Sequence, residues 1–365
     1  MTNRERLLLL LKGQAPDRVP WFGDLDYWYS AAKRAGTLDP KYSGDGYFQL
    51  TRDLGVGFYL QGYMPFKTES DGVSFHSEES GGVVTTYMDT PKGTLTETSK
   101  WLPASSSYGF VKHMVESADD LPAFTYYIEN LRYTPDYGEA ARRGDIVGDN
   151  GVVLCYTPRT PYMQMATTYS GVVNLIFLLE DYPEETDRLL RLMEEKFDIG
   201  AGLAVESPAE CIMIPQNLSS EAVGLKYYER YLRPTEKKWL KLIKEAGKTS
   251  FIHMDGTLRG LLSHVVKTGY DVIEAATPIP AGDMTMREIA DMVDGEAIIW
   301  GGLPGTIFTP KVTDDEFTEH VINTLEVMRE KPRYVLGVAD QVPPDGLLSR
   351  VAAVAGLCDK YGKYI

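Results

Sequence analysis

The segment YYERYLRPTEKKWLKLIKEAGKTSFIHM (227–254) joins an amphipathic helical pattern to a short, mostly apolar run. Apolar residues recur at three- and four-residue spacing over 227–247, which is typical of a helix packed on one face. The run SFIHM (250–254) has the uninterrupted apolar character of a strand buried on both faces. The same pairing recurs along the chain, so this segment predicts a repeating α/β architecture.

Six such runs follow residue 150, and helical patterns such as DDEFTEHVINTLEVMREK (314–331) lie between them. The early segments RVPWFGDL (18–25) and VGFYLQGY (56–63) add two more, which gives the eight strands of a closed parallel barrel. No GxGxxG motif follows an early strand, which disfavours a dinucleotide-binding open sheet. We therefore predict a (β/α)8 TIM barrel formed by a single domain over residues 1–365. The six runs are GVVLCY (151–156), CIMIP (211–215), SFIHM (250–254), DVIEAA (271–276), AIIWGG (297–302) and YVLGVA (334–339).

Residues 71–100 have a different pattern, with alternating Thr, Val and Tyr and with Gly-Gly and Pro-Lys-Gly turns. Alternation of this kind between turn residues indicates antiparallel strands. We expect a β-hairpin excursion from the barrel here and no second domain.

The chain carries 52 acidic and 37 basic side chains and a formal net charge of −15. Nucleic-acid binding is disfavoured because it needs a basic face that contacts phosphates, and an anionic membrane surface is disfavoured for the same reason. Cys155, Cys211 and Cys358 are too few and too far apart for a disulfide framework, and no apolar run is long enough to span a membrane. We expect a cytoplasmic protein in a reducing compartment.

Charged side chains follow several predicted strands at their carboxyl ends, where barrels carry their active sites. His253 and Asp255 occupy alternate positions and so face the same way, while Glu274 and Asp340 end two other strands. One imidazole with two or three carboxylates suits a divalent metal such as zinc. In the alternative reading, His-x-Asp-Gly is turn chemistry, and the other carboxylates pair with arginine or cap helices.

Aromatic, methionine and amide side chains also follow the predicted strands. Such a lining suits a flat organic substrate, although ordinary core packing explains aromatic residues equally well. The candidate substrate-binding residues are Tyr27, Trp28, Tyr156, Tyr162, Met163, Gln216 and Asn217.

Four segments carry a recognisable pattern: RERLLLLLKGQAPDRVPW (4–21), FIHMDGTLRGLL (251–262), GGLPGTIF (301–308) and YVLGVADQVPPDGLLSRVAAV (334–354). They resemble the uroporphyrinogen decarboxylase superfamily over nearly the whole chain. The resemblance implies a (β/α)8 barrel and one of two chemistries, which are porphyrinogen decarboxylation and zinc-dependent methyl exchange with a corrinoid protein.

The decarboxylase branch holds its polycarboxylate substrate with an arginine-rich segment after the first strand. Here that place reads WFGDLDYWYSAAKRAG (21–36), and Asp24 and Asp26 would repel a polycarboxylate. The resemblance therefore favours the methyltransferase branch.

In the thiol-activating methyltransferases, the metal is held by a His-x-Cys after one strand and a Cys before a Pro-Pro turn. The matching positions are His253, Asp255 and Asp340, so the resemblance implies catalytic metal ligands here with aspartate replacing both thiolates. Glu274 matches a carboxylate ligand of some members. A harder ligand set leaves zinc more Lewis acidic and better able to polarise an ether oxygen.

The resemblance and the acidic ligand set together predict removal of a methyl group from a small methylated compound, most simply a methoxylated aromatic. The methyl group would pass to a Co(I) corrinoid. None of the five histidines has Asp two places before it, as corrinoid-carrying modules do, so the corrinoid is expected on a separate protein. Family resemblance also makes a homodimer reasonable.

Three alternatives stay open. One is methyl transfer from methylcobalamin to a thiol or another acceptor. Another is a decarboxylase-like lyase with a different substrate. The third is a non-catalytic barrel that binds a corrinoid or tetrapyrrole without a metal.

Overall fold

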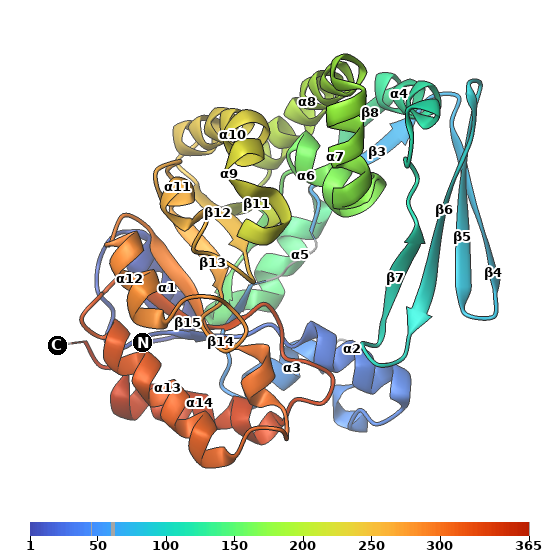
Figure 1. The fold of residues 1–365 in the computed structure, drawn as a ribbon. Coiled ribbons are helices and arrows are strands. Elements are labelled where there is room, and N and C mark those ends of the chain that lie inside the picture. The colour runs from blue at the N-terminus through green and yellow to red at the C-terminus, as the bar shows by residue number, and fades with distance from the viewer. Residues whose placement is uncertain (45, 60–62, 365) are drawn as a thin grey trace.

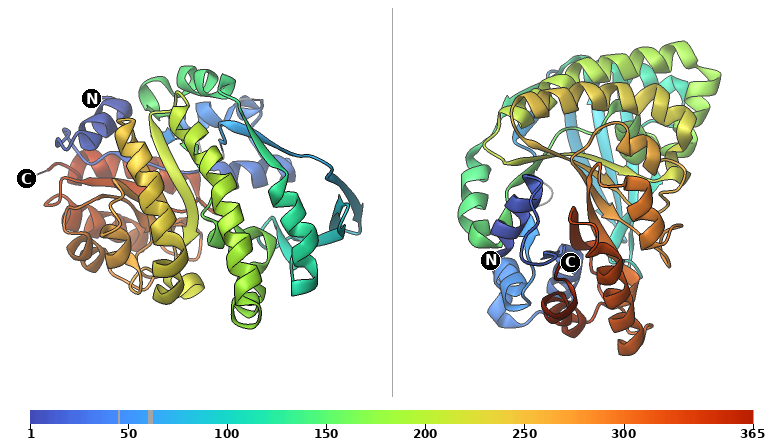
Figure 2. Two further views of the ribbon diagram at one scale, coloured as in Figure 1. Left: turned by 90° about the horizontal axis from the view of Figure 1, so that it is seen from above. Right: turned by 90° about the vertical axis from the view of Figure 1, so that its left-hand side faces the viewer.

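The computed structural model describes residues 1–44, 46–59 and 63–364. At its centre is a curved, seven-stranded parallel sheet in the order β1-β15-β14-β13-β12-β11-β10, with helices on its outer face (Figures 1 and 2). The strands of this sheet are β1 (Trp21–Phe22), β10 (Leu154–Tyr156), β11 (Cys211–Leu218), β12 (Thr249–Met254), β13 (Val272–Ala276), β14 (Ile298–Pro304) and β15 (Tyr334–Ala339).

The predicted α/β class and its curved parallel sheet are confirmed, with seven strands in the main sheet and no closed eight-stranded barrel among the described residues. A separate two-stranded parallel sheet joins β2 (Phe58–Tyr59) to β9 (Gly151–Val152), and an isolated bridge links Phe22 to Gly57. All six runs predicted after residue 150 form strands, and YVLGVA coincides with β15. Residues 60–62 of the predicted run VGFYLQGY lie outside the described residues.

Helices follow most of the parallel strands and pack against the sheet through their apolar faces, as the helical patterns predict. No helix in the described part of the chain is long and apolar enough to cross a lipid bilayer. The helices are α1 (Asn3–Leu11), α2 (Asp26–Ala35), α3 (Gly46–Asp53), α4 (Leu121–Glu129), α5 (Gly138–Val147), α6 (Pro161–Gln164), α7 (Gly171–Asp181), α8 (Pro183–Glu206), α9 (Ser220–Tyr227), α10 (Arg233–Glu245), α11 (Leu262–Val266), α12 (Met286–Val293), α13 (Asp314–Met328) and α14 (Leu348–Tyr361).

The concave side of the sheet is filled by a cluster of buried apolar side chains. Leu7 and Leu10 of α1 belong to the same cluster, so this amphipathic helix contributes directly to the core inside the sheet. Burial of each leucine contributes about 1.5–3 kcal/mol to stability. Alternate strand residues supply the rest of the cluster, which includes Phe22, Leu154, Met213, Phe251, Val272, Trp300 and Val335.

The predicted excursion is confirmed in kind and is larger than residues 71–100. A four-stranded antiparallel sheet is formed by β4 (Ser74–Ser80), β5 (Val83–Thr90), β6 (Gly93–Leu102) and β7 (Ser107–Lys112). It reaches from α4 towards α2 at one side of the molecule (Figure 1). A further antiparallel pair, β3 (Phe66–Ser70) and β8 (Leu131–Pro135), lies beside it in sequence. Met88 and Leu95 attach the excursion to the large core.

Candidate active site at the carboxyl ends of the strands

The candidate site is built on the second layer of side chains inside the curved sheet. Phe251 of β12 and Val272 of β13 belong to the interior cluster. His253 and Glu274 lie two residues further along the same strands and therefore face the same interior. The two residues are direct register partners, so the sheet itself brings the imidazole and the carboxylate together.

The His253 Nδ1 atom lies 2.5 Å from Glu274 Oε2, and both side chains are buried. Burial alone lowers the pKa of His253, but the adjacent carboxylate of Glu274 outweighs it and raises the pKa to about 9. The Glu274 contact orients the ring, and the His253 Nε2 atom lies 3.9 Å from Asp340 Oδ1. The imidazole is thus held at Nδ1 and presents Nε2 to the other acids.

Asp340 and Asp255 complete the acidic group around Nε2. Asp340 follows β15 and has a backbone φ of +69°, a value that residues other than glycine rarely adopt. Burial raises the pKa of Asp340. The charge of His253 opposes this shift, whereas the carboxylates of Asp255 and Glu274 add to it. Asp255 is partly buried, and its backbone N–H donates to the Leu218 carbonyl at 3.1 Å.

A fourth acid, Asp24, follows β1 on the adjoining side of the site. Its carboxylate accepts hydrogen bonds from the Asp26 backbone N–H at 2.8 Å and from Gln341 Nε2 at 3.2 Å. Burial raises the pKa of Asp24 to about 7, and repulsion from Asp26, Asp340 and Glu274 adds to the shift. The carboxyl ends of β1, β12, β13 and β15 therefore form a strongly acidic site.

The predicted aromatic residues of α2 are partly buried and tether this helix. The Tyr27 hydroxyl donates to the Ser105 carbonyl of the excursion, and Trp28 Nε1 donates to the Gly346 carbonyl at 3.0 Å. Tyr156 ends β10, packs against the interior cluster and pairs in register with Met213, which pairs with Phe251. Tyr156 therefore faces the inside of the sheet, one layer before His253 and Glu274.

The other predicted binding residues are engaged elsewhere. Gln216 is fully buried, where its amide binds Thr160 at 3.0–3.1 Å and donates to Glu236 Oε1 at 2.7 Å. Tyr162 is fully buried and stacks with Tyr227 and Tyr231 at ring-centroid distances of 5.6 and 5.7 Å. Met163 is buried in the large core, whereas Asn217 is exposed and has a φ of +54°.

Comparison with known proteins identifies the family of this chain. Residues 152–361 match the family model described as uroporphyrinogen decarboxylase (URO-D). The chain belongs to the uroporphyrinogen decarboxylase family. This match covers the strands that carry His253, Glu274 and Asp340.

Two relatives of this family member come from Methanosarcina mazei. Over 105 residues the chain is 28% identical to the methylcobamide:CoM methyltransferase MtbA, and the match spans 27% of this chain and 31% of that protein. A methyltransferase from the same organism superposes with a TM-score of 0.63 at 15% identity over 99% of each chain. The second likeness shows a shared fold.

A zinc site needs several imidazole, thiolate or carboxylate donors around one point. The donors are chemically suitable, because one imidazole nitrogen and carboxylate oxygens are zinc ligands. In residues 1–44, 46–59 and 63–364, however, no three His, Cys, Asp or Glu side chains lie close enough together to share an ion. Glu274 forms a hydrogen bond with Nδ1 of His253. In metal sites, a carboxylate at this position orients the histidine and does not bind the metal itself. The described residues therefore hold no preformed metal centre.

Sequence reasoning missed Arg159, which lies three residues after β10 in the turn Thr157–Thr160. Its side chain is largely buried, and its buried Nε atom has no hydrogen-bond partner among the described residues. An arginine between Thr-Pro and Thr-Pro directly after a strand was the available signal. Its significance depends on what the folded chain places around it.

Proposed function

We propose that this chain is a methyltransferase that takes a methyl group from a small methoxylated aromatic compound and passes it to a Co(I) corrinoid on a separate protein. The observation that carries the proposal is the acidic site in which Glu274 holds Nδ1 of His253 and leaves Nε2 facing Asp340. Membership of the family and the partial match to MtbA support methyl transfer as the reaction class.

The reaction breaks the bond between the methyl carbon and the ether oxygen, and the electron pair stays on that oxygen. The Co(I) corrinoid supplies the electron pair for the new bond to carbon. The leaving oxygen then needs a proton or a cation, because a phenolate formed inside an acidic site is strongly disfavoured. An imidazole oriented through Nδ1 can donate a proton from Nε2, as general acids do.

Zinc is the other electrophile in this proposal. His253, Asp255 and Asp340 would hold the ion after the two aspartates turn towards Nε2, and Glu274 would orient the imidazole as an outer partner. The ion would supply Lewis acidity beside the ether oxygen. Metal analysis of the purified protein after zinc supplementation separates the two versions. A bound equivalent that His253→Ala removes supports zinc, and less than a tenth of an equivalent opposes it.

A corrinoid assay tests the reaction itself. The enzyme, a Co(I)-corrinoid protein and a panel of methoxyarenes are mixed, and the absorption spectrum reports methylation of the corrinoid. We expect His253→Ala to lower the rate at least about 100-fold, the usual scale of a lost general acid. His264→Ala is the matched control, because His264 lies on α11 and pairs with Glu229 at 2.8 Å in a part-buried contact. No spectral change across the panel would contradict the proposal.

The reverse direction is the second candidate, favoured by the printed name of MtbA, in which methylcobamide is the methyl donor. In this version a methylated corrinoid gives its methyl group to a thiol or another acceptor. The same spectrum, started from the methylated corrinoid with and without a thiol, measures it. The homodimer and the cytoplasmic location stay predictions from the sequence.

A further inference from the structure

We infer that Arg159 binds the single carboxylate of an aromatic acid substrate, so that the substrates are methoxylated benzoates or close analogues. This inference rests on the proposed function and names its substrate class. Three observations carry it: the lack of a protein partner for Arg159, its position beside Tyr156, and the distribution of charge around the site.

The first observation is an unbonded cation in a largely buried position. Nε of Arg159 is buried without a hydrogen bond, and the guanidinium forms no ion pair with any described residue. Burial of an uncompensated charge is costly, so proteins normally pair such groups. Arg329 shares this feature but lies at the opposite ends of the strands, so the position of Arg159 after the carboxyl end of β10 distinguishes it. Five other largely buried arginines each pair with a carboxylate: Arg6 with Asp17, Arg18 with Asp359, Arg143 with Glu139, Arg233 with Glu229 and Arg350 with Asp314.

The second observation places Arg159 at the site. Tyr156 packs on the interior cluster and so faces the inside of the curved sheet, where its register partner Met213 pairs with Phe251, one layer before His253 and Glu274. Arg159 lies close enough to Tyr156 for the two side chains to interact electrostatically. The turn that carries Arg159 follows the carboxyl end of β10, the end at which barrel-like folds bind their substrates. Arg159 therefore borders the site from β10, two strands away from β12.

The third observation is the charge on the other strands. Asp255, Glu274 and Asp340 lie near His253, and Asp24 lies near Asp340 and Glu274. None of these four acids forms an ion pair with Arg159. A ligand with several carboxylates would be repelled by these acids. A ligand with one carboxylate can place it on Arg159 and turn its uncharged end towards the acids. A flat benzoate with a para-methoxy group has this polarity.

The guanidinium suits this ligand because its planar fork matches a carboxylate with two parallel hydrogen bonds. The ring then lies beside the Tyr156 side chain, and the methoxy group extends towards Nε2 of His253. In this pose, Arg159 is a specificity-determining residue that selects the acid and fixes which end of the ring reaches the reacting atoms.

The test measures binding without the corrinoid, by titration calorimetry of 4-methoxybenzoate and of its uncharged analogue 4-methoxybenzamide. We expect wild type to bind the acid at least tenfold more tightly than the amide. Arg159→Gln should weaken binding of the acid at least tenfold and change binding of the amide less than twofold. Arg159→Lys should recover part of the affinity, since it restores the charge without the bidentate fork.

Arg329→Gln is the matched control, because Arg329 is also largely buried with an unbonded Nε but lies before β15, at the opposite ends of the strands. It should bind both ligands as wild type does, and circular dichroism checks that every variant is folded. Equal affinity of wild type for acid and amide would overturn the inference, even if a variant does not fold. So would no measurable binding of the acid, or displacement of it by equimolar inorganic phosphate.

The outcome also separates this inference from the proposed function. Arg159-dependent binding of the acid without any methylation of the corrinoid would retain the binding site and refute the methyltransferase. Methylation from neutral methoxyarenes, with no preference for the acids, would retain the methyltransferase and refute the role of Arg159.

Discussion

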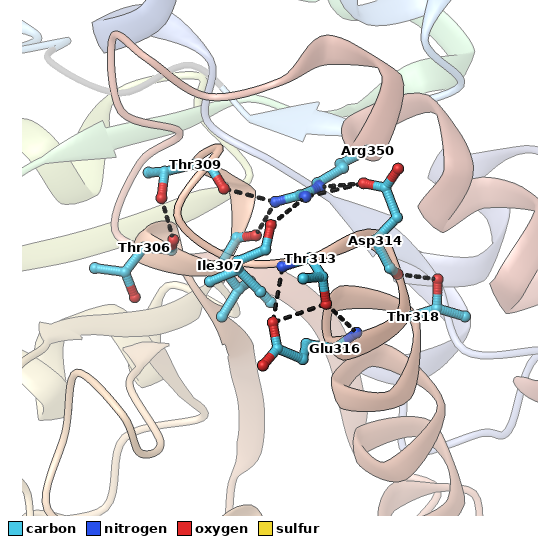
Figure 3. Close-up of polar contacts among 9 residues, drawn as sticks. Thr306, Ile307, Thr309, Thr313, Asp314, Glu316, Thr318 and Arg350 are labelled. Carbon is cyan, nitrogen blue, oxygen red and sulfur yellow. Dashed lines mark hydrogen bonds and ion pairs between the residues drawn. The ribbon is translucent and has the colours of Figure 1, made fainter.

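Two largely buried arginines, Arg350 and Arg159, follow opposite rules of charge compensation. Arg350 of α14 donates to the carbonyls of Ile307, Thr309 and Val312 and to the Asp314 carboxylate, at 2.5–3.0 Å (Figure 3). Arg159 has no such partner in the described part of the chain. Both side chains carry a guanidinium cation. Described residues of the protein compensate the charge of Arg350 but not that of Arg159.

The difference separates a structural role from a binding role. Arg350 holds the loop after β14 against the first turn of α13, where Thr313 and Glu316 form a capping box. Its hydrogen bonds are complete, so no donor is left for a ligand. Arg159 retains its donors for a partner from outside the chain. The pair His253–Glu274 lies between these cases, since Nδ1 contacts Glu274 at 2.5 Å, whereas Nε2 has only the more distant Asp340 carboxylate at 3.9 Å.

The largest effect is expected from the compensated arginine. Arg350→Met should lower the free energy of unfolding by about 3–5 kcal/mol, because it leaves two buried carbonyls, one part-buried carbonyl and the Asp314 carboxylate without their donor. Urea denaturation measures the change. Arg287→Met is the control, because its pair with Glu330 at 3.8 Å is largely exposed and should contribute less than about 1 kcal/mol. A loss below about 1 kcal/mol at Arg350 would remove the contrast with Arg159.

An intermediate effect is expected from the half-compensated histidine. The pKa of His253 is raised from 6.5 to about 9 in the folded protein, so the folded state keeps a proton that the unfolded state loses. The resulting stability is fully present below pH 6.5 and is lost as the pH rises through about 9. Its size is on the order of 3 kcal/mol.

Glu274→Gln should remove most of this pH dependence, because it removes the charge that holds the proton on His253. Urea denaturation of metal-free protein at pH 6.5 and pH 9 measures it for wild type and variant. Glu229→Gln, at the part-buried His264 pair, is the control. An unchanged pH dependence in Glu274→Gln would show that another group holds the proton.

The smallest effect on stability is expected from the uncompensated arginine. Arg159→Met should leave the free energy of unfolding unchanged or raise it by up to about 1 kcal/mol, because it replaces an unpaired charge by an apolar side chain of similar length. With 4-methoxybenzoate present, the melting temperature of wild type should rise and that of the variant should not. Destabilisation by more than about 2 kcal/mol would assign Arg159 a structural role like that of Arg350.

The sequence predicted the parallel strands well because strands buried on both faces read as continuous apolar runs. The excursion was harder to delimit. Residues 71–100 carry the clearest turns, but the exposed strand SFHSEES (74–80) and the strand at 107–112 lack an apolar face that would mark their ends. The prediction that Gln216 binds substrate could not foresee its contacts. The register between β11 and β12 shifts after Ile214, and the Gln216 amide donates to Glu236 in the core.

By itself, the sequence determined the α/β class, the acidic character and the histidine and carboxylates that end β12, β13 and β15, because these follow from local patterns of apolar runs and charge. Only the tertiary structure decided which atoms meet. Register pairs Glu274 with Nδ1 of His253, and the packing of the segment after β10 leaves Nε of Arg159 without a hydrogen-bond partner among the described residues. Partnership between residues far apart in sequence depends on strand register and on the packing around each side chain, and neither is written in any local segment.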